Sequence, residues 1–236
     1  MRILYIFPHP DDESFGPARV MFKQRRQGHE VYLLTLTKGG ATKQRFKLGY
    51  SIEEMGEIRY KEMLEVAKTL ELSGMTVLDL PDSGLKEMDP REIEKVIIQE
   101  TERLQPQVVV TYAVHGISGF HDHLVSHAVV KRVFVEMKEK HTWLKRQAFT
   151  TLTQEEAQKS PHFRLNSSTV EEIDCVYQVD PVDIAKNLKA LDCYETFQET
   201  IEKSGIKGLV RQKEVVFEIY QESHDPPLSN LFESLP

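Results

Sequence analysis

Two short segments concentrate side chains that can bind a metal ion. The first, Pro8–Glu13, reads PHPDDE and places one imidazole and three carboxylates within five positions. The second, His115–His123, reads HGISGFHDH and adds three histidines. Histidine and carboxylate groups are common ligands of catalytic zinc, which takes three protein ligands and keeps a fourth position for water. These residue types therefore indicate a catalytic metal centre.

Each of these residues taken alone has a simpler interpretation. Asp11 or Asp12 could cap a following helix, because an acidic residue after a strand is most often an N-cap. His127, one helical turn beyond the second segment, would by itself be solvated or hydrogen-bonded, and His29 and His141 belong to no cluster. The metal interpretation is favoured because both dense segments directly follow predicted strands.

The elements that position these segments predict an α/β fold. Compact apolar runs at 3–7, 31–36 and 108–113 are typical of buried parallel strands. Weaker strand patterns occur at 77–80, 148–152, 175–179 and 215–220, and helical spacing occurs at 15–27, 52–72, 90–104, 124–137 and 183–202. We expect a single domain over 1–236, with a Rossmann-like, mostly parallel sheet, helices on both faces and a small C-terminal elaboration.

This fold also predicts where the two segments meet. In an open parallel sheet, ligands bind beyond the carboxyl ends of the strands, which lie along one edge. His9, Asp12 and one or more of the later histidines can therefore share one cleft. The segment 38–50, which follows the second strand, is expected to form a rim of that cleft and to influence substrate choice.

Composition narrows the classes of partner. A net charge of −7 argues against a nucleic-acid binder, because phosphate binding needs a basic field. Two cysteines are too few for a disulfide framework, and no apolar stretch approaches the length of a membrane span. We therefore expect a cytoplasmic protein with a small-molecule substrate, no nucleic-acid partner and no membrane span; a homo-oligomer stays open.

The segment Pro8–Glu13 resembles the signature of the LmbE-like, or PIG-L, deacetylases. This is a family of Rossmann-like zinc enzymes that act on N-acetylglucosamine-containing substrates. Weaker matches extend the resemblance over most of the chain: Arg59 and Glu62 in an Arg-x-x-Glu helix, the Leu80–Leu85 turn, Gly116–His123, and Lys189–Leu191 with Tyr194.

The resemblance implies specific roles at the metal. His9, Asp12 and His123 become the zinc ligands, and Asp11 becomes the general base that takes a proton from the attacking water. Ferrous iron or cobalt also suits a site of two histidines and one aspartate. Glu13 and Asp122 are expected to lie next to the ligands and to orient them without binding the metal.

The second family motif, His-Pro-Asp-His, is altered in this chain. Its first histidine, which can stabilise the oxyanion or protonate the leaving amine, falls on Phe120, and its proline falls on His121. His121 or His115 must supply that function, or it is left mainly to zinc. We expect His121 to be the catalytic substitute because of its proximity in the sequence.

The resemblance further implies that Arg59 and Asp82 bind sugar hydroxyls through charge-assisted hydrogen bonds. The alternative for Arg59 is an ion pair with an acidic neighbour on an exposed helix, and spacing alone does not separate the two.

The combined prediction is a zinc-dependent amidohydrolase that removes the N-acetyl group from a GlcNAc-containing small molecule or glycoside. Three alternatives stay open: a metal-dependent phosphoesterase, disfavoured because two-metal sites need more bridging ligands; a hydrolase of another amide; and a non-catalytic metal- or sugar-binding module.

Overall fold

A seven-stranded sheet organises the computed structural model, which describes residues 1–160 and 164–235. Its order is β3-β2-β1-β4-β5-β7-β6, and β7 runs antiparallel to both of its neighbours whereas the other pairs are parallel. The strands are β1 (Arg2–Phe7), β2 (Glu30–Thr37), β3 (Gly74–Leu80), β4 (Val108–Tyr112), β5 (Arg146–Thr150), β6 (Cys175–Gln178) and β7 (Glu214–Ile219). The expected Rossmann-like, mostly parallel sheet is confirmed.

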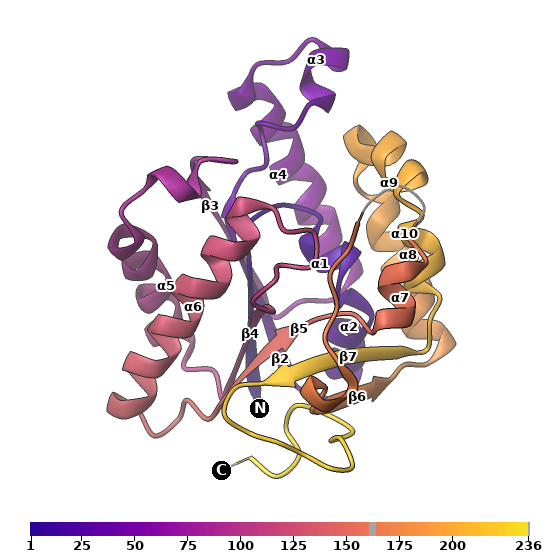
Figure 1. The fold of residues 1–236 in the computed structure, drawn as a ribbon. Helices are drawn as coiled ribbons and strands as arrows, with labels where there is room; N and C mark the ends of the chain where they lie inside the picture. The colour runs from indigo at the N-terminus through magenta and orange to yellow at the C-terminus, as the bar shows by residue number, and fades with distance from the viewer. Residues whose placement is uncertain (161–163, 236) are drawn as a thin grey trace.

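Helices cover both faces of this sheet (Figure 1). One face carries α1 (Asp12–Phe15), α2 (Ala18–Arg26), α4 (Ile52–Thr69) and α8 (Pro181–Asp192), and the other carries α5 (Pro90–Leu104) and α6 (His121–Lys140). Strand β1 shows why two apolar layers form: Ile3, Tyr5 and Phe7 pack into one core, and Leu4 and Ile6 pack into the other. A continuous apolar run is what a strand buried on both faces requires.

Shorter elements lie around the carboxyl edge of the sheet and in the connections. They are α3 (Gln44–Leu48), α7 (Gln154–Gln158), α9 (Gln198–Ser204), α10 (Ile206–Val210), and the 3-10 turns η1 (Leu85–Glu87), η2 (Val170–Glu172) and η3 (Glu195–Phe197). Among the described residues, no helix is long and apolar enough to cross a membrane.

Two of the expected helices were wrong in their extent. The helix expected over 15–27 is divided at Gly16 and Pro17, because Gly16 leaves the helical region and proline has no N–H for a helix interior. The helix expected over 183–202 ends at Asp192, and the chain turns at Tyr194 before α9 begins. Both breaks border the candidate site described below.

The C-terminal segment after β7 is attached to the sheet by a buried arginine. Arg146, whose side chain is fully buried, pairs with both carboxylate oxygens of Glu222 at 2.9 and 2.6 Å. It also donates to the carbonyl oxygens of Leu231, Glu233 and Ser234. One guanidinium therefore holds the last described residues against β5.

Glu222→Gln should lower the free energy of unfolding by roughly 1.5–3 kcal/mol, the usual contribution of hydrogen bonds to a charged group, because it removes the counter-charge of the buried Arg146 guanidinium. Burial raises the pKa of Glu222, but Arg146 and His224 outweigh it and hold this pKa below its usual value. A carboxylate with a lowered pKa in the folded state stabilises the fold above its unfolded-state pKa and loses this effect as pH falls. Urea unfolding should therefore separate the two proteins at neutral pH and bring them together in acid.

The matched control is Glu199→Gln, because Glu199 makes its ion pairs with Lys47 and Lys203 on the surface. That variant should unfold almost as the parent does. An equal loss of unfolding free energy in Glu222→Gln and Glu199→Gln would contradict a special contribution of the Arg146–Glu222 pair to stability.

Candidate metal centre and active site

The candidate site forms where β1 and β4 lie side by side. The two strands are parallel, with Ile3 opposite Val108 and Tyr5 opposite Val110. The segments that leave their carboxyl ends, residues 8–13 and 113–123, therefore emerge at the same edge of the sheet.

His9, Asp12 and His123 converge at this edge. Each offers one ligand atom, and these atoms all lie within 4.8 Å of one another. The Nε2 atom of His123 lies 3.3 Å from Oδ1 of Asp12, and Nδ1 of His9 lies 3.5 Å from Oδ2 of Asp12. The donor set is thus two imidazoles and one carboxylate from two different strand ends.

The outer nitrogen of each imidazole has a hydrogen-bond acceptor. In His9, Nε2 is 3.2 Å from Asp122 Oδ2 and 3.4 Å from Asp82 Oδ1. In His123, Nδ1 is 2.9 Å from the carbonyl oxygen of Gly116. If these nitrogens carry the protons, both remaining lone pairs face Asp12, which is the arrangement found around histidine ligands of metals. The residues present therefore fit a divalent metal ion.

Electrostatics also favour a cation here. Burial lowers the pKa of His9, but hydrogen bonds to Asp12 and Asp122 and the charges of Asp12 and Asp82 raise it to about 10. The carboxylates of Asp12, Asp82 and Asp122 thus surround the His9 imidazole and stabilise a positive charge on it. A metal ion bound at Nδ1 can supply that charge in place of a proton.

Tyr112, the last residue of β4, supports the cluster from below and was missed in the sequence. Its hydroxyl donates to Asp12 Oδ1 at 2.7 Å, and its ring stacks on His123 with centroids 4.2 Å apart. The backbone N–H of His9 donates to the other oxygen of Asp12 at 2.8 Å. In the sequence, the only feature that pointed to Tyr112 was its position near the end of a predicted strand, just before the histidine-rich segment His115–His123.

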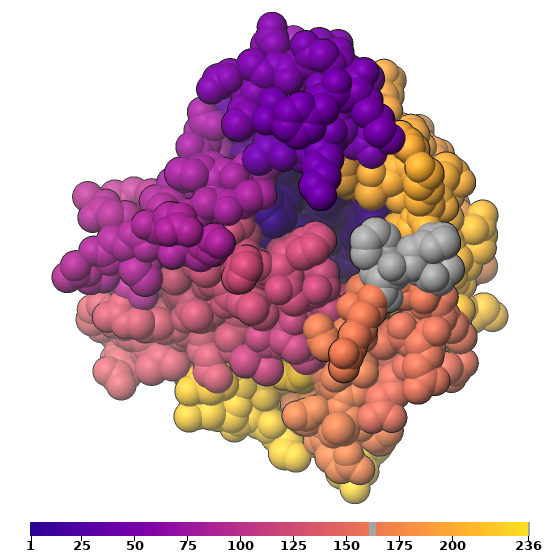
Figure 2. Space-filling view, turned by 45° about the horizontal axis from the view of Figure 1, so that its top comes forward, coloured from indigo at the N-terminus to yellow at the C-terminus, as the bar shows by residue number. Residues whose placement is uncertain are grey.

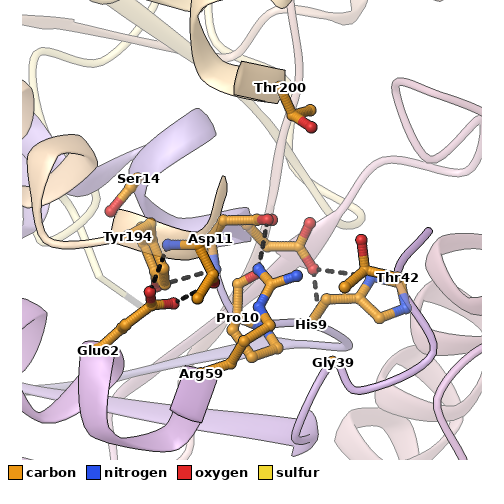
Figure 3. A network of polar contacts seen from close by, with 12 residues as sticks. His9, Pro10, Asp11, Ser14, Gly39, Thr42, Arg59, Glu62, Tyr194 and Thr200 are labelled. Atoms are coloured by element: carbon orange, nitrogen blue, oxygen red, sulfur yellow. Dashed lines mark hydrogen bonds and ion pairs between the residues drawn. The ribbon is translucent and has the colours of Figure 1, made fainter. Parts of the chain in front are cut away.

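Asp11 lies beside the ligand Asp12 but makes different contacts. Its carboxylate accepts a hydrogen bond from Arg59 Nη2 at 2.6 Å, and the same nitrogen donates to the carbonyl of Pro10 at 2.8 Å (Figure 3). Burial raises the pKa of Asp11 and Asp12 adds to the rise, whereas Arg59 opposes it, and the result is about 6. A carboxylate with this pKa can exchange a proton near neutral pH.

The other predicted site residues take varied positions. Arg59 is 2% exposed and lines the cavity, where its guanidinium pairs with Asp11 rather than with an acidic residue of its own helix. Asp82 accepts from the N–H of Ala41 at 2.6 Å and also lines the cavity. Asp122 accepts from the N–H of Ser83 at 2.8 Å, so it is fixed while it faces His9.

In the described part of the chain, the Glu13 carboxylate forms no hydrogen bond with His9, Asp12 or His123. It is fully buried, and its Oε1 accepts from Ser14 Oγ at 2.6 Å and from the hydroxyl of Tyr194 at 2.7 Å. Burial raises its pKa to about 7. Its partner Tyr194 had only a loose match in the sequence.

His115 and His121 were the two candidates to replace the family histidine. In the described part of the chain, neither of them lines the cavity. His121 is exposed in the first turn of α6, and His115 faces Thr151 Oγ1 at 3.3 Å. Phe120 does line the cavity, and its ring meets the edge of His123 with centroids 5.6 Å apart. The role expected of His121 stays a prediction that this placement does not favour.

A cavity of about 950 Å³ opens over the cluster. Figure 2 shows it as a hollow with indigo N-terminal residues at its floor, the purple segment around α3 above it and the orange helices near the C-terminus beside it. Gly39 and residues 41–44 line it, so the segment 38–50 does form part of the rim. Away from the cluster the walls combine apolar and polar side chains. The apolar ones include Phe15, Leu152, Phe197, Ile206 and Leu209, and the polar ones include Lys43, Glu156, Lys159, Thr200 and Gln212.

The fold and the site together define a Rossmann-like α/β protein in which two histidines and one aspartate, a group that could hold a metal ion, lie at the carboxyl edge of the sheet. Sequence comparison gives the particular family. Residues 4–134, more than half of the chain, match the PIG-L family, described as GlcNAc-PI de-N-acetylase. The chain belongs to this family, as its motifs predicted.

Individual proteins extend the comparison. The mycothiol S-conjugate amidase of Streptomyces coelicolor is 30% identical over 152 residues, which is 57% of this chain and 52% of that protein. The chain thus spans about half the length of this relative. A deacetylase of the teicoplanin biosynthetic pathway, solved as a triple mutant, shares the fold with a TM-score of 0.72 at 15% identity, over 94% of this chain and 99% of that one.

The same fold also occurs with other chemistry. The 4-carboxy-2-hydroxymuconate hydratase of Pseudomonas putida KT2440 has a TM-score of 0.66 at 12% identity, over 98% of this chain and 99% of the hydratase. The fold alone therefore does not specify deacetylation, and the reaction must be argued from the side chains.

Proposed function

We propose that this protein is a zinc-dependent amidohydrolase that removes the acetyl group from an N-acetylated glucosamine derivative. One observation carries the proposal: His9, Asp12 and His123 converge at the floor of a cavity, with the carboxylate of Asp11 beside them but outside the ligand set. A binding module has no need of a spare carboxylate at this position. Membership of the PIG-L family supports the same reaction.

Zinc held by His9, Asp12 and His123 would supply a Lewis acid that activates water and polarises the amide carbonyl. The protein itself would manage the protons. Asp11 accepts the proton of the attacking water and, once protonated, can pass it to the leaving amine. Arg59 holds the Asp11 carboxylate at 2.6 Å and keeps it aimed while its charge changes. Acetate and the free amine are the products.

The cavity suggests a substrate larger than a monosaccharide. Its volume of about 950 Å³ lies near the upper end of the usual range for small-molecule sites, roughly 300–1,000 Å³. Asp82 and Arg59 offer polar contacts near the cluster, as expected for sugar hydroxyls, and Phe197, Ile206 and Leu209 offer apolar wall on the side of α9 and α10. We infer an N-acetylglucosaminide that carries an apolar group.

Acetate release from octyl and methyl N-acetylglucosaminides by zinc-loaded protein tests both parts of this proposal. The octyl glycoside should have a kcat/KM at least about tenfold higher, because each buried methylene contributes about 0.8 kcal/mol. Chelation should stop release, and added zinc should restore it. Equal kcat/KM values for the two glycosides would refute the proposal that the substrate carries an apolar group. Metal-loaded protein that releases no acetate from either compound would refute the proposed deacetylase activity.

A further inference from the structure

Tyr194 contacts the proposed base, Asp11, and lies beyond residues 4–134, the part of the chain that matches the PIG-L family. It follows α8 at the break before η3, and its side chain is fully buried. Its hydroxyl oxygen lies 2.8 Å from the backbone nitrogen of Asp11 (Figure 3). The same oxygen lies 2.7 Å from Glu13 Oε1. Because a backbone N–H can only donate, the hydroxyl accepts a hydrogen bond from Asp11 and donates one to Glu13.

Asp11 has an unusual backbone that needs such support. Its φ is 88° and its ψ is −23°, in the left-handed region that glycine adopts freely and other residues adopt rarely. Non-glycine residues persist there only when their surroundings hold them. The hydrogen bond to Tyr194 fixes the N–H of the very peptide that sets this φ.

Glu13 gives the Tyr194 hydroxyl its direction. Its Oε1 accepts from both Ser14 and Tyr194, whereas its Oε2 is buried without a hydrogen-bond partner among the described residues. A fully buried carboxylate that does not reach the metal ligands is thus used to orient a phenol. The phenol in turn holds the neighbouring peptide.

Helix α4 holds the other side of the same arrangement. Arg59 binds the Asp11 carboxylate, and Glu62, one turn later, accepts from Thr196 N at 2.7 Å and from Thr196 Oγ1 at 3.0 Å. Thr196 lies two residues after Tyr194. The side chain of Asp11 and the turn that carries Tyr194 are therefore fastened to adjacent turns of one helix.

We propose that Tyr194 is a positioning residue for the deacetylation reaction. Its hydroxyl, oriented by Glu13, holds Asp11 in the left-handed conformation that points the carboxylate into the cavity. In the described part of the chain, Tyr194 is not among the residues that line the cavity, so its effect passes through Asp11. This inference rests on the proposed function.

The test compares Tyr194→Phe with Tyr177→Phe in zinc-loaded protein. Tyr177 is an equally buried tyrosine remote from the site, and its hydroxyl also accepts from a backbone N–H, that of Leu231 at 3.0 Å. Tyr194→Phe should lower kcat by about 10- to 100-fold with KM and bound zinc unchanged, since small misplacements of a reacting group cost this much. Tyr177→Phe should leave kcat unchanged, even if its Tm falls by as much as that of Tyr194→Phe.

Any of three results of this kinetic comparison would overturn the inference: a kcat within twofold of the parent, a loss of kcat no greater than that in Tyr177→Phe, or a change confined to KM or zinc content. In an Asp11→Asn background, the added Tyr194→Phe should cost little more, because both act on one group. A crystal structure of Tyr194→Phe gives a readout independent of activity. An unchanged φ at Asp11 would reject the positioning role even if the parent released no acetate and the proposed function itself had failed.

Discussion

Asp11→Asn should lower kcat for acetate release by about 10²- to 10⁴-fold, the usual contribution of a general base. Asparagine tolerates the left-handed backbone conformation of this position and keeps an oxygen for Arg59, but it cannot take a proton from water. The bound zinc should stay near one equivalent, because Asp11 lies outside the ligand set. The measurements are initial rates of acetate release and metal analysis of the same sample.

The control for this variant is Asp79→Asn, which alters an exposed aspartate on β3. It should retain the parent's rate and metal content. Because Asp11→Asn leaves the Arg59 guanidinium without its counter-charge, Tm should be recorded for both variants. Asp11→Asn protein that is folded, metal-loaded and normally active would remove Asp11 from the role of base.

His123→Ala should abolish both zinc retention and acetate release, with a fall in rate of at least about 10³-fold. The imidazole supplies one of three ligands, and alanine at this position leaves only His9 and Asp12. Equilibrium dialysis against zinc, followed by metal analysis, measures the first effect without any substrate.

His127→Ala is the matched control, because His127 lies one turn later on α6, is 6% exposed as His123 is, and also places its Nδ1 2.9 Å from a backbone carbonyl, that of Tyr112. Both variants lose a buried imidazole of the same helix, so their stabilities should fall alike. Zinc retained by His123→Ala, or lost equally from both proteins, would contradict the proposed ligand set.

The fold was predictable where apolar patterns are continuous. The runs at 3–7, 31–36 and 108–113 became β1, β2 and β4, because strands buried on both faces need an unbroken apolar sequence. The pairing of β5 and β6 with the antiparallel β7 was not predictable, since local sequence does not specify strand direction. One helix end was wrong where tertiary contacts decide it, at Tyr194, whereas the break at Gly16 and Pro17 has a local cause that the helical spacing concealed.

The candidate site was predictable only in part for a similar reason. The dense motifs at strand ends predicted one shared cleft, the family resemblance implied that His9, Asp12 and His123 are the ligands, and the structure brings these three residues together. The pairing of Arg59 with Asp11 and the contacts of Tyr112 and Tyr194 join residues 48 to 183 positions apart. Such pairings depend on the assembled fold, and spacing in the sequence does not specify which residues meet.

The adjacency of β1 and β4 also bears on when, during folding, the chain could first bind the proposed zinc ion. The two ligands on the first segment are separated from His123 by most of three βα units, so no local hairpin or helix can assemble the set. Contacts of such long sequence separation form late and slowly in folding. Zinc should therefore bind only after β4 has paired with β1. The rate of zinc binding during refolding should then report the rate at which this long-range strand pair forms.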